Sequence, residues 1–242
     1  MCNDEIYSDA IEFYDIASAS QPDISKKILE GFVELSAINQ GIILDIGAGT
    51  GKLTTKISSM IPHKEILALE PSKYMRIAFM TRLSEYKELQ KKVTILPITL
   101  EQYNFEDDIS GVICMGVLGH LTKEERESLW ETLEKRLKTD TPVLIGLLDK
   151  KFLSVPIGTV LSIAQQGKNR YETFIREKKC NNKKKCEWVI AYRISYKNKV
   201  IREINCPISW NYENEEVVLK ELSYANFRCA KISDTLLFAR KR

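Results

Sequence analysis

The sequence is poor in histidine and lacks the paired cysteine motifs of metal sites. Only two histidines occur in 242 residues, His63 and His120, and the six cysteines form no C-x-x-C pair. Because Cys/His metal sites need such clusters at short spacing, a metal centre has little support. We expect reduced cysteines in a cytoplasmic protein. Cys180 and Cys186, which enclose the segment NNKKK, leave a disulfide or a metal site open as alternatives.

Charge of one sign and long apolar runs are also missing. The net charge is +3 from 36 basic and 33 acidic residues, which argues against a dedicated nucleic-acid binder. No apolar run reaches the roughly 18 residues of a membrane span, so we expect no membrane partner. The opening MCNDEIYSDA carries acidic residues instead of a secretory apolar stretch. The basic run REKKCNNKKKCE is interpreted as a solvated loop tip.

The apolar residues instead follow an alternating pattern of strands and helices. Continuous apolar runs predict strands buried on both faces, and apolar residues at helical spacing predict the helices between them. The predicted strands cover 42–46, 65–70, 93–98, 111–117 and 141–148. The predicted helices cover 3–18, 24–36, 52–61, 72–86 and a segment that begins with a capping box at Thr122 and Glu125 and runs to 137.

The character of the chain changes after residue 150. The segment 186–206 predicts an antiparallel hairpin that turns near 197–199. A helix should follow, with Asn214 as its N-cap and Asn226 in a left-handed conformation at its end. Residues 229–242 predict one or two closing strands.

Strands that alternate with helices imply a parallel sheet with helices on both faces. We therefore expect an α/β fold with a mostly parallel sheet and an antiparallel strand insertion late in the chain. The expected organisation is one domain over 1–242. Its expected parts are an N-terminal helical segment (1–39), a core (40–150), an insertion (151–210) and a closing helix with strands (211–242).

The segment ILDIGAGTGKLT, residues 42–53, looks like a nucleotide-binding loop. A P-loop would need a glycine where Ile46 stands and a hydroxyl where Leu53 stands. A dinucleotide fingerprint would need a third glycine where Lys52 stands. The spacing that is present, Gly47-x-Gly49-x-Gly51, fits neither.

Two carboxylates flank this loop and indicate the ligand. Asp45 precedes the glycines, where it would repel a pyrophosphate but attract a ligand with an ammonium group. Glu70 ends the next predicted strand, where a carboxylate can accept hydrogen bonds from both ribose hydroxyls. The expected ligand is therefore an adenosine with a cationic group and no phosphate.

With these features, ILDIGAGTGKLT, ALEPSKYM and LEQYNFEDDISGVICMGVLGHL resemble the core of the class I S-adenosylmethionine-dependent methyltransferases. The resemblance covers roughly residues 40–150. It implies a Rossmann-like fold with a mostly parallel seven-stranded sheet. It also implies that 1–39 form a helical cap, 40–150 the cofactor-binding core and 151–210 a substrate-cap insertion. It is most similar to the small-molecule enzymes of that family that modify sugars, quinones and natural products. The late hairpin, the helix that ends in ANF and the final LLFARK are similar to these enzymes as well.

The resemblance implies a set of cofactor-binding residues. They are Asp45, Gly47, Ala48, Gly49, Gly51, Glu70, Pro71, Met75, Thr99, Leu100, Glu101, Met115 and Tyr14. The loop would line the methionine part, Glu70 would bind the ribose, and Pro71 with Met75 would pack near the adenine. Where the family usually has an acidic side chain for the adenine amino group, this chain has Thr99, so the Leu100 backbone or Glu101 is the alternative contact.

Several residues near the expected site have two interpretations. His120, just after the fourth strand, is either a base that takes a proton from the acceptor or a helix-entry histidine bonded to backbone. Asp149 either faces the substrate or is a loop carboxylate. Tyr7 and Tyr14 lie on an N-terminal helix that closes over the cofactor in such enzymes, or Tyr14 is core packing. The aromatic residues of the late hairpin either wall a pocket or pack on the sheet: Trp188, Tyr192, Tyr196 and Trp210.

The predicted function is transfer of a methyl group from S-adenosylmethionine to an oxygen or nitrogen of a small-molecule acceptor, with S-adenosylhomocysteine as product. The alternatives are an RNA or protein methyltransferase, which the basic run would favour, and a non-catalytic regulatory subunit that binds S-adenosylmethionine. A nicotinamide oxidoreductase is a further alternative, against which the missing third glycine argues.

Overall fold

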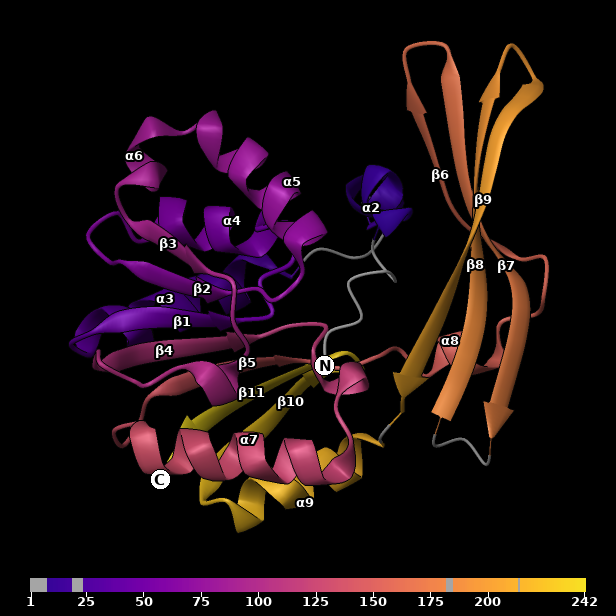
Figure 1. The fold of residues 1–242 in the computed structure, drawn as a ribbon. Coiled ribbons are helices and arrows are strands. Elements are labelled where there is room, and N and C mark those ends of the chain that lie inside the picture. Colours follow the sequence, from indigo (N-terminus) through magenta and orange to yellow (C-terminus); the bar gives the residue numbers. More distant parts are fainter. Residues whose placement is uncertain (1–7, 19–23, 182–184, 213) are drawn as a thin grey trace. The chain divides into compact units, whose positions relative to one another are not determined.

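The computed structural model describes residues 8–18, 24–181, 185–212 and 214–242. The chain divides into two compact units (Figure 1). The core unit comprises Ile24–Asp149 and Glu213–Arg242, and the second unit comprises Met1–Asp23 and Lys150–Tyr212. The predicted helix over 24–36, assigned above to an N-terminal cap, therefore groups with the core unit.

The core unit is built on one sheet of seven strands in the order β10-β11-β5-β4-β1-β2-β3 (Figure 1). The strands are β1 (Ile42–Ile46), β2 (Ile66–Leu69), β3 (Val93–Leu96), β4 (Ile109–Cys114), β5 (Pro142–Gly146), β10 (Phe227–Ser233) and β11 (Leu236–Lys241). The first five are parallel, and β11 runs antiparallel to both β5 and β10. The predicted fold class is confirmed. The strand order reverses between β1 and β4, and ligands of open α/β sheets bind at such a switch point.

Helices cover both faces of this sheet because the central strands are apolar on both faces. The helices are α3 (Lys26–Ile38), α4 (Lys52–Met60), α5 (Lys73–Ser84), α6 (Lys87–Gln90), α7 (Lys123–Arg136) and α9 (Glu215–Tyr224). Along β1, Ile43 packs in the cluster formed with α3, α4 and α5, whereas Leu44 and Ile46 pack in the cluster formed with α7 and α9. This alternation follows from the period of two in a strand.

The predicted capping residues at the helix ends of this unit are confirmed. Thr122 and Glu125 form a reciprocal capping box at the start of α7. The Asn214 side chain accepts a hydrogen bond from the Glu216 N–H at the start of α9. Asn226 has φ 66°, so it adopts the left-handed conformation predicted after this helix.

The second unit contains an antiparallel sheet of four strands in the order β6-β7-β8-β9. Its elements are α2 (Ile11–Ser18), α8 (Lys151–Ser154), β6 (Val160–Gln166), β7 (Asn169–Asn181), β8 (Lys185–Tyr196) and β9 (Lys199–Asn211). The predicted hairpin is β8–β9, with Lys197 and Asn198 at positive φ in its turn. Strands β6 and β7 were not predicted. The apolar residues of β6 are interrupted by Ser162 and followed by two glutamines, and β7 is rich in polar and charged residues.

The basic run around residue 180 is not a simple loop tip. Its described residues, 176–181 and 185–187, form the ends of β7 and β8, in which Cys180 pairs with Cys186 across the strands and is joined to it by a disulfide. The expectation that these two cysteines are reduced is therefore wrong, and the disulfide alternative is correct. Cys114, Cys206 and Cys229 are free. Within the described ranges, no group of His, Cys, Asp and Glu could hold a metal ion, and no helix is long and apolar enough to cross a membrane.

Candidate functional site

The carboxyl ends of four parallel strands bring most predicted site residues to one edge of the core sheet. Asp45 lies in β1 and the glycine loop follows it, Glu70 follows β2, residues 99–101 follow β3, and Met115 follows β4. Parallel strands end at the same edge, so residues that are far apart in the sequence become neighbours there. The edge includes the switch point between β1 and β4.

The glycine loop is held in shape by backbone hydrogen bonds to the end of β2. Gly47 and Ala48 both donate their N–H groups to the Leu69 carbonyl, at 2.8 and 3.2 Å. The three glycines have φ of 65°, 58° and 72°, a region that side chains with a Cβ rarely adopt. A turn of this shape leaves the backbone of the loop exposed to a bound ligand.

Two of the loop glycines are required for different reasons. A Cβ on Gly51 would lie 2.0 Å from the Phe79 ring, so this glycine allows α5 to pack against the start of α4. A Cβ on Gly49 would meet nothing within 4 Å. Gly49 therefore borders open space, as expected where a ligand approaches the backbone closely.

The Glu70 carboxylate joins the glycine loop to the residues after β2 by hydrogen bonds. Its side chain is 5% exposed. One carboxylate oxygen accepts the Gly49 N–H at 2.7 Å and the other accepts the Ser72 N–H at 2.8 Å. Arg76 donates to the Glu70 carbonyl at 2.8 Å. These bonds place an ionisable carboxylate directly beside the tip of the glycine loop.

Asp45 is the second carboxylate of the site and is buried, with 3% exposed. Burial raises its pKa from 3.8 to about 7, a hydrogen bond from Thr54 opposes that rise, and the nearby charge of Glu70 adds to it. The Thr54 hydroxyl donates to the carboxylate at 2.6 Å. Sequence analysis missed Thr54, whose only signal is its place on the inward face of α4. A buried carboxylate beside a second one favours a cationic ligand group over a phosphate.

The residues predicted to surround an adenine lie after β2 and β3. Pro71 is half-buried, and Met75 is buried in the first turn of α5, which Ser72 caps. Thr99 caps a short 3-10 helix, η1 (Leu100–Gln102). Leu100 is buried in the core, and Glu101 is exposed.

Met115 and His120 lie beyond β4. A Cβ on Gly146 of β5 would lie 2.7 Å from the Met115 side chain, so the two strand ends are in close contact. His120 ends a second 3-10 helix, η2 (Leu118–His120). Its side chain is exposed, yet the surrounding protein lowers its pKa from the ordinary value by desolvation. A neutral imidazole at neutral pH is able to accept a proton.

The predicted aromatic residues lie in the second unit or outside the described residues, whereas Asp149 follows β5 at the same carboxyl edge of the core sheet. Tyr14 lies in α2 of the second unit and is 37% exposed, and Tyr7 lies outside the described residues. Of the hairpin aromatics, Tyr192 is buried and stacks on Phe13 with ring centroids 5.0 Å apart, which is packing within its own unit. Asp149 follows β5 and is half-buried.

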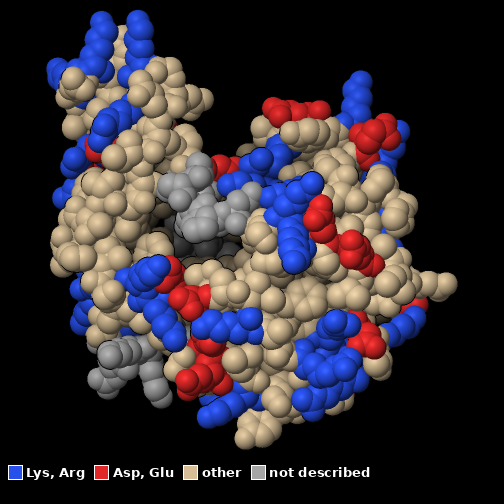
Figure 2. Space-filling view, turned by 180° about the vertical axis from the view of Figure 1, so that it is seen from behind, with Lys and Arg blue, Asp and Glu red and all other residues tan. Residues whose placement is uncertain are grey.

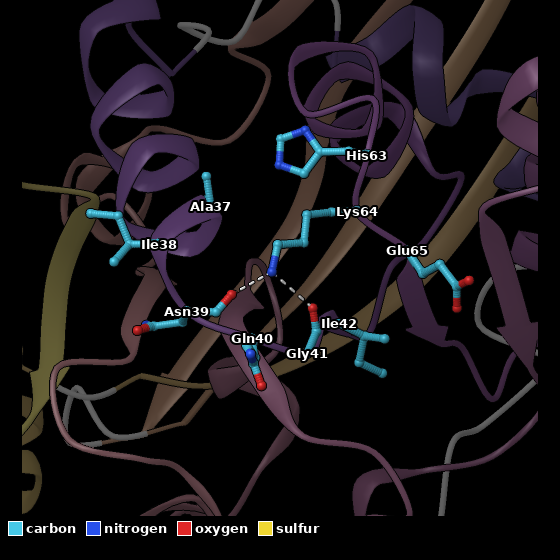
Figure 3. Close-up of a pocket in the computed structure, with 9 residues that line it drawn as sticks. All are labelled: Ala37, Ile38, Asn39, Gln40, Gly41, Ile42, His63, Lys64 and Glu65. Carbon is cyan, nitrogen blue, oxygen red and sulfur yellow. Dashed lines mark hydrogen bonds between the residues drawn. The ribbon is translucent and has the colours of Figure 1, made fainter.

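A surface groove of about 420 Å³ lies at the opposite, amino-terminal edge of β1 and β2 (Figure 3). His63 and Lys64 line it, and Lys64 donates to the backbone carbonyls of Asn39 and Gly41. These bonds satisfy carbonyls just after α3, which is a structural role. The prediction that His63 is a surface residue on the far edge is confirmed.

The comparisons with known proteins agree with this geometry. Residues 43–140 match the family model described as a methyltransferase domain. No curated protein matches the chain by sequence. The segment with the glycine loop, both carboxylates and His120 all falls within the matched residues.

Several solved structures share the fold over nearly the whole chain. An amino pentose methyltransferase, CalS10 from Micromonospora echinaspora with bound S-adenosylmethionine, has a TM-score of 0.73 at 12% identity and covers 95% of this chain and 96% of its own. DesVI from Streptomyces venezuelae has a TM-score of 0.72 at 12% identity, with 96% and 98% covered. The sugar N-methyltransferase KedS8 from Streptoalloteichus sp. has a TM-score of 0.69 at 14% identity, with 95% and 92% covered.

The fold is therefore one that solved methyltransferases share, and residues 43–140 match the model of a methyltransferase domain. The prediction of a class I S-adenosylmethionine-dependent methyltransferase is confirmed at the level of the domain family and the fold.

Proposed function

We propose that this protein transfers a methyl group from S-adenosylmethionine to an oxygen or nitrogen of a small-molecule acceptor. The observation that carries the proposal is the pairing of two buried carboxylates, Asp45 and Glu70, around a glycine loop that has open space above Gly49. This arrangement suits an adenosine ligand with a cationic tail. It does not suit a pyrophosphate, which Asp45 would repel.

The residues present fit this cofactor. Gly49 leaves the space that a Cβ would fill, and Glu70 is positioned by two backbone N–H groups for contact with ribose hydroxyls. Asp45, held by Thr54, supplies the negative charge for an α-ammonium group. Thr99, Leu100 and Glu101 after β3, with Pro71 and Met75 after β2, form the expected adenine surroundings.

When bound, S-adenosylmethionine supplies a methyl group already activated by its sulfonium and leaves as S-adenosylhomocysteine. The protein therefore contributes mainly orientation of the acceptor and exclusion of water. The His120 imidazole, neutral at neutral pH, takes the proton of the acceptor hydroxyl or amine. The named relatives, an amino pentose methyltransferase and a sugar N-methyltransferase, suggest amino sugars as the first acceptors to test.

Calorimetric titration with S-adenosylhomocysteine, beside NADH and ATP, tests the cofactor. Two glutamates flank β2, which gives a matched pair of variants: Glu70→Ala at the carboxyl end and Glu65→Ala at the amino end. We expect binding of S-adenosylhomocysteine alone, weakened at least tenfold by Glu70→Ala and unchanged by Glu65→Ala. Preference for NADH or ATP, or equal effects of the two variants, would contradict the proposal.

An RNA methyltransferase is the rival with structural support. Lysines gather at the ends of the β6–β7 and β8–β9 hairpins (Figure 2), and they include the exposed Lys168, Lys197 and Lys199. RNA affinity that falls steeply with salt, together with label transfer to RNA from methyl-labelled cofactor, would favour this rival. Label transfer to an amino sugar without RNA affinity would favour the small-molecule acceptor.

A further inference from the structure

A buried ion pair joins two helices beside the candidate site. Arg126 of α7 and Glu221 of α9 have side chains that are 1% and 7% exposed. The Arg126 Nε and one terminal nitrogen each donate to a carboxylate oxygen of Glu221, at 3.2 and 2.9 Å. The Trp130 indole N–H donates to the same carboxylate at 3.1 Å. Glu221 therefore accepts three hydrogen bonds from α7.

The remaining terminal nitrogen of Arg126 reaches the segment that carries His120. It donates to the Leu121 carbonyl at 3.4 Å. The hydrogen bonds within the segment are local, from the His120 N–H to the Val117 carbonyl and from the Leu121 N–H to the Leu118 carbonyl. The guanidinium thus connects η2 to α9, which lies 95 residues away from Arg126 in the sequence.

Stability alone does not explain why a charged pair occupies this place. A buried ion pair is often no more stabilising than apolar side chains of the same volume, because both charges lose their hydration. The other inward residues of α7, Leu129 and Leu133, are apolar. A guanidinium differs in having five N–H donors in a rigid planar fork, which can bind a carboxylate and a carbonyl at once. A lysine ammonium is a point charge and lacks this fork.

We propose that Arg126 is a positioning residue that fixes η2, and with it the His120 imidazole, by joining the Leu121 carbonyl to the Glu221 carboxylate of α9. This inference rests on the proposed function, since it gives His120 a role in methyl transfer. Arg126 acts only through the backbone of the η2 segment.

A matched pair of variants separates positioning from packing. Arg126→Lys keeps the positive charge beside Glu221 but loses the fork that reaches Leu121. Trp130→Phe removes another donor to the same carboxylate and leaves the Leu121 contact in place. Both variants should lower the stability of the protein, because each weakens the same buried network. Only the first should loosen η2.

NMR on the 242-residue chain, with and without S-adenosylhomocysteine, measures the amide exchange rates and the pKa of His120. The chain has only two histidines, so His63→Asn assigns the ring signals. In Arg126→Lys, we expect amide exchange over 118–121 to accelerate about tenfold or more and the His120 pKa to move back toward its ordinary value. Trp130→Phe should leave both unchanged, and calorimetry should give the same S-adenosylhomocysteine affinity for both variants. If Arg126→Lys does not fold, the double variant Arg126→Met/Glu221→Gln replaces it, because it removes the Leu121 contact and leaves no unpaired buried charge.

Equal exchange and an unchanged His120 pKa in the two variants would overturn the inference, because the network would then serve packing alone. A wild-type protein that does not bind S-adenosylhomocysteine would instead overturn the proposed function. The exchange comparison between the variants can still be made in that case, so the two failures are distinguishable.

Discussion

Replacing Asp45 by asparagine should stabilise the fold at pH 8 and abolish cofactor binding. The carboxylate is buried, and its pKa is about 7 in the folded protein against an ordinary 3.8. The folded state therefore binds the proton more tightly than the unfolded state does. As a result, wild-type stability falls as the pH rises from about 4 to about 7, and it stays constant above that.

The size of the effect follows from the difference between these two pKa values. A difference of about 3 units, at about 1.4 kcal/mol per unit, corresponds to about 4 kcal/mol of lost stability above pH 7. Asparagine does not titrate and still offers an oxygen to the Thr54 hydroxyl. The advantage of Asp45→Asn in the free energy of unfolding should be about 1–2 kcal/mol at pH 5 and about 4 kcal/mol at pH 8.

Urea unfolding of the wild type and Asp45→Asn at pH 5, 6.5 and 8 measures this difference. Thr54→Val is the second variant, in which Asp45 is kept. It removes the hydrogen bond that lowers the Asp45 pKa, so it should lower the free energy of unfolding at pH 8. Calorimetry should show that Asp45→Asn loses affinity for S-adenosylhomocysteine at least tenfold, since an ammonium loses its charged acceptor. A stability difference that is the same at pH 5 and pH 8 would refute the reasoning.

Other predictions concern the loop and the base. Gly51→Ala should cost about 2–4 kcal/mol in unfolding free energy, because the new methyl group overlaps the Phe79 ring and φ is positive; a melting temperature equal to wild type would contradict this. Gly49→Ala should cost only about 1–2 kcal/mol but weaken S-adenosylhomocysteine binding at least tenfold by calorimetry, whereas normal affinity would place the ligand elsewhere. His120→Asn should lower kcat about 10²–10⁴-fold and remove the acid limb of the pH profile, which in the wild type should lie below 6.5 because desolvation lowers the pKa. If the acid limb of the pH profile is unchanged in His120→Asn, another group than His120 produces it.

The sequence by itself determined the core sheet and the edge at which the site lies. Strands β1, β2, β4 and β5 are mostly apolar and buried on both faces. Strand β3 is apolar except for the exposed Thr94. The helix between β1 and β2 begins directly after Gly51, so the position of the loop was readable from spacing alone. The capping residues Thr122 and Asn214 act within a few residues of themselves, which is why local sequence was enough to predict them.

Only the tertiary structure decided the features that depend on partners distant in sequence. Strand β7 is rich in polar and charged residues and is held by pairing with β8, and β6, whose apolar residues Ser162 interrupts, is held by pairing with β7. The disulfide of Cys180 depends on the register of that pairing. The raised pKa of Asp45 and the ion pair of Arg126 follow from burial against elements 9 to 95 residues away. Burial and pairing of charges are properties of the folded chain, and no periodicity in the sequence predicts them.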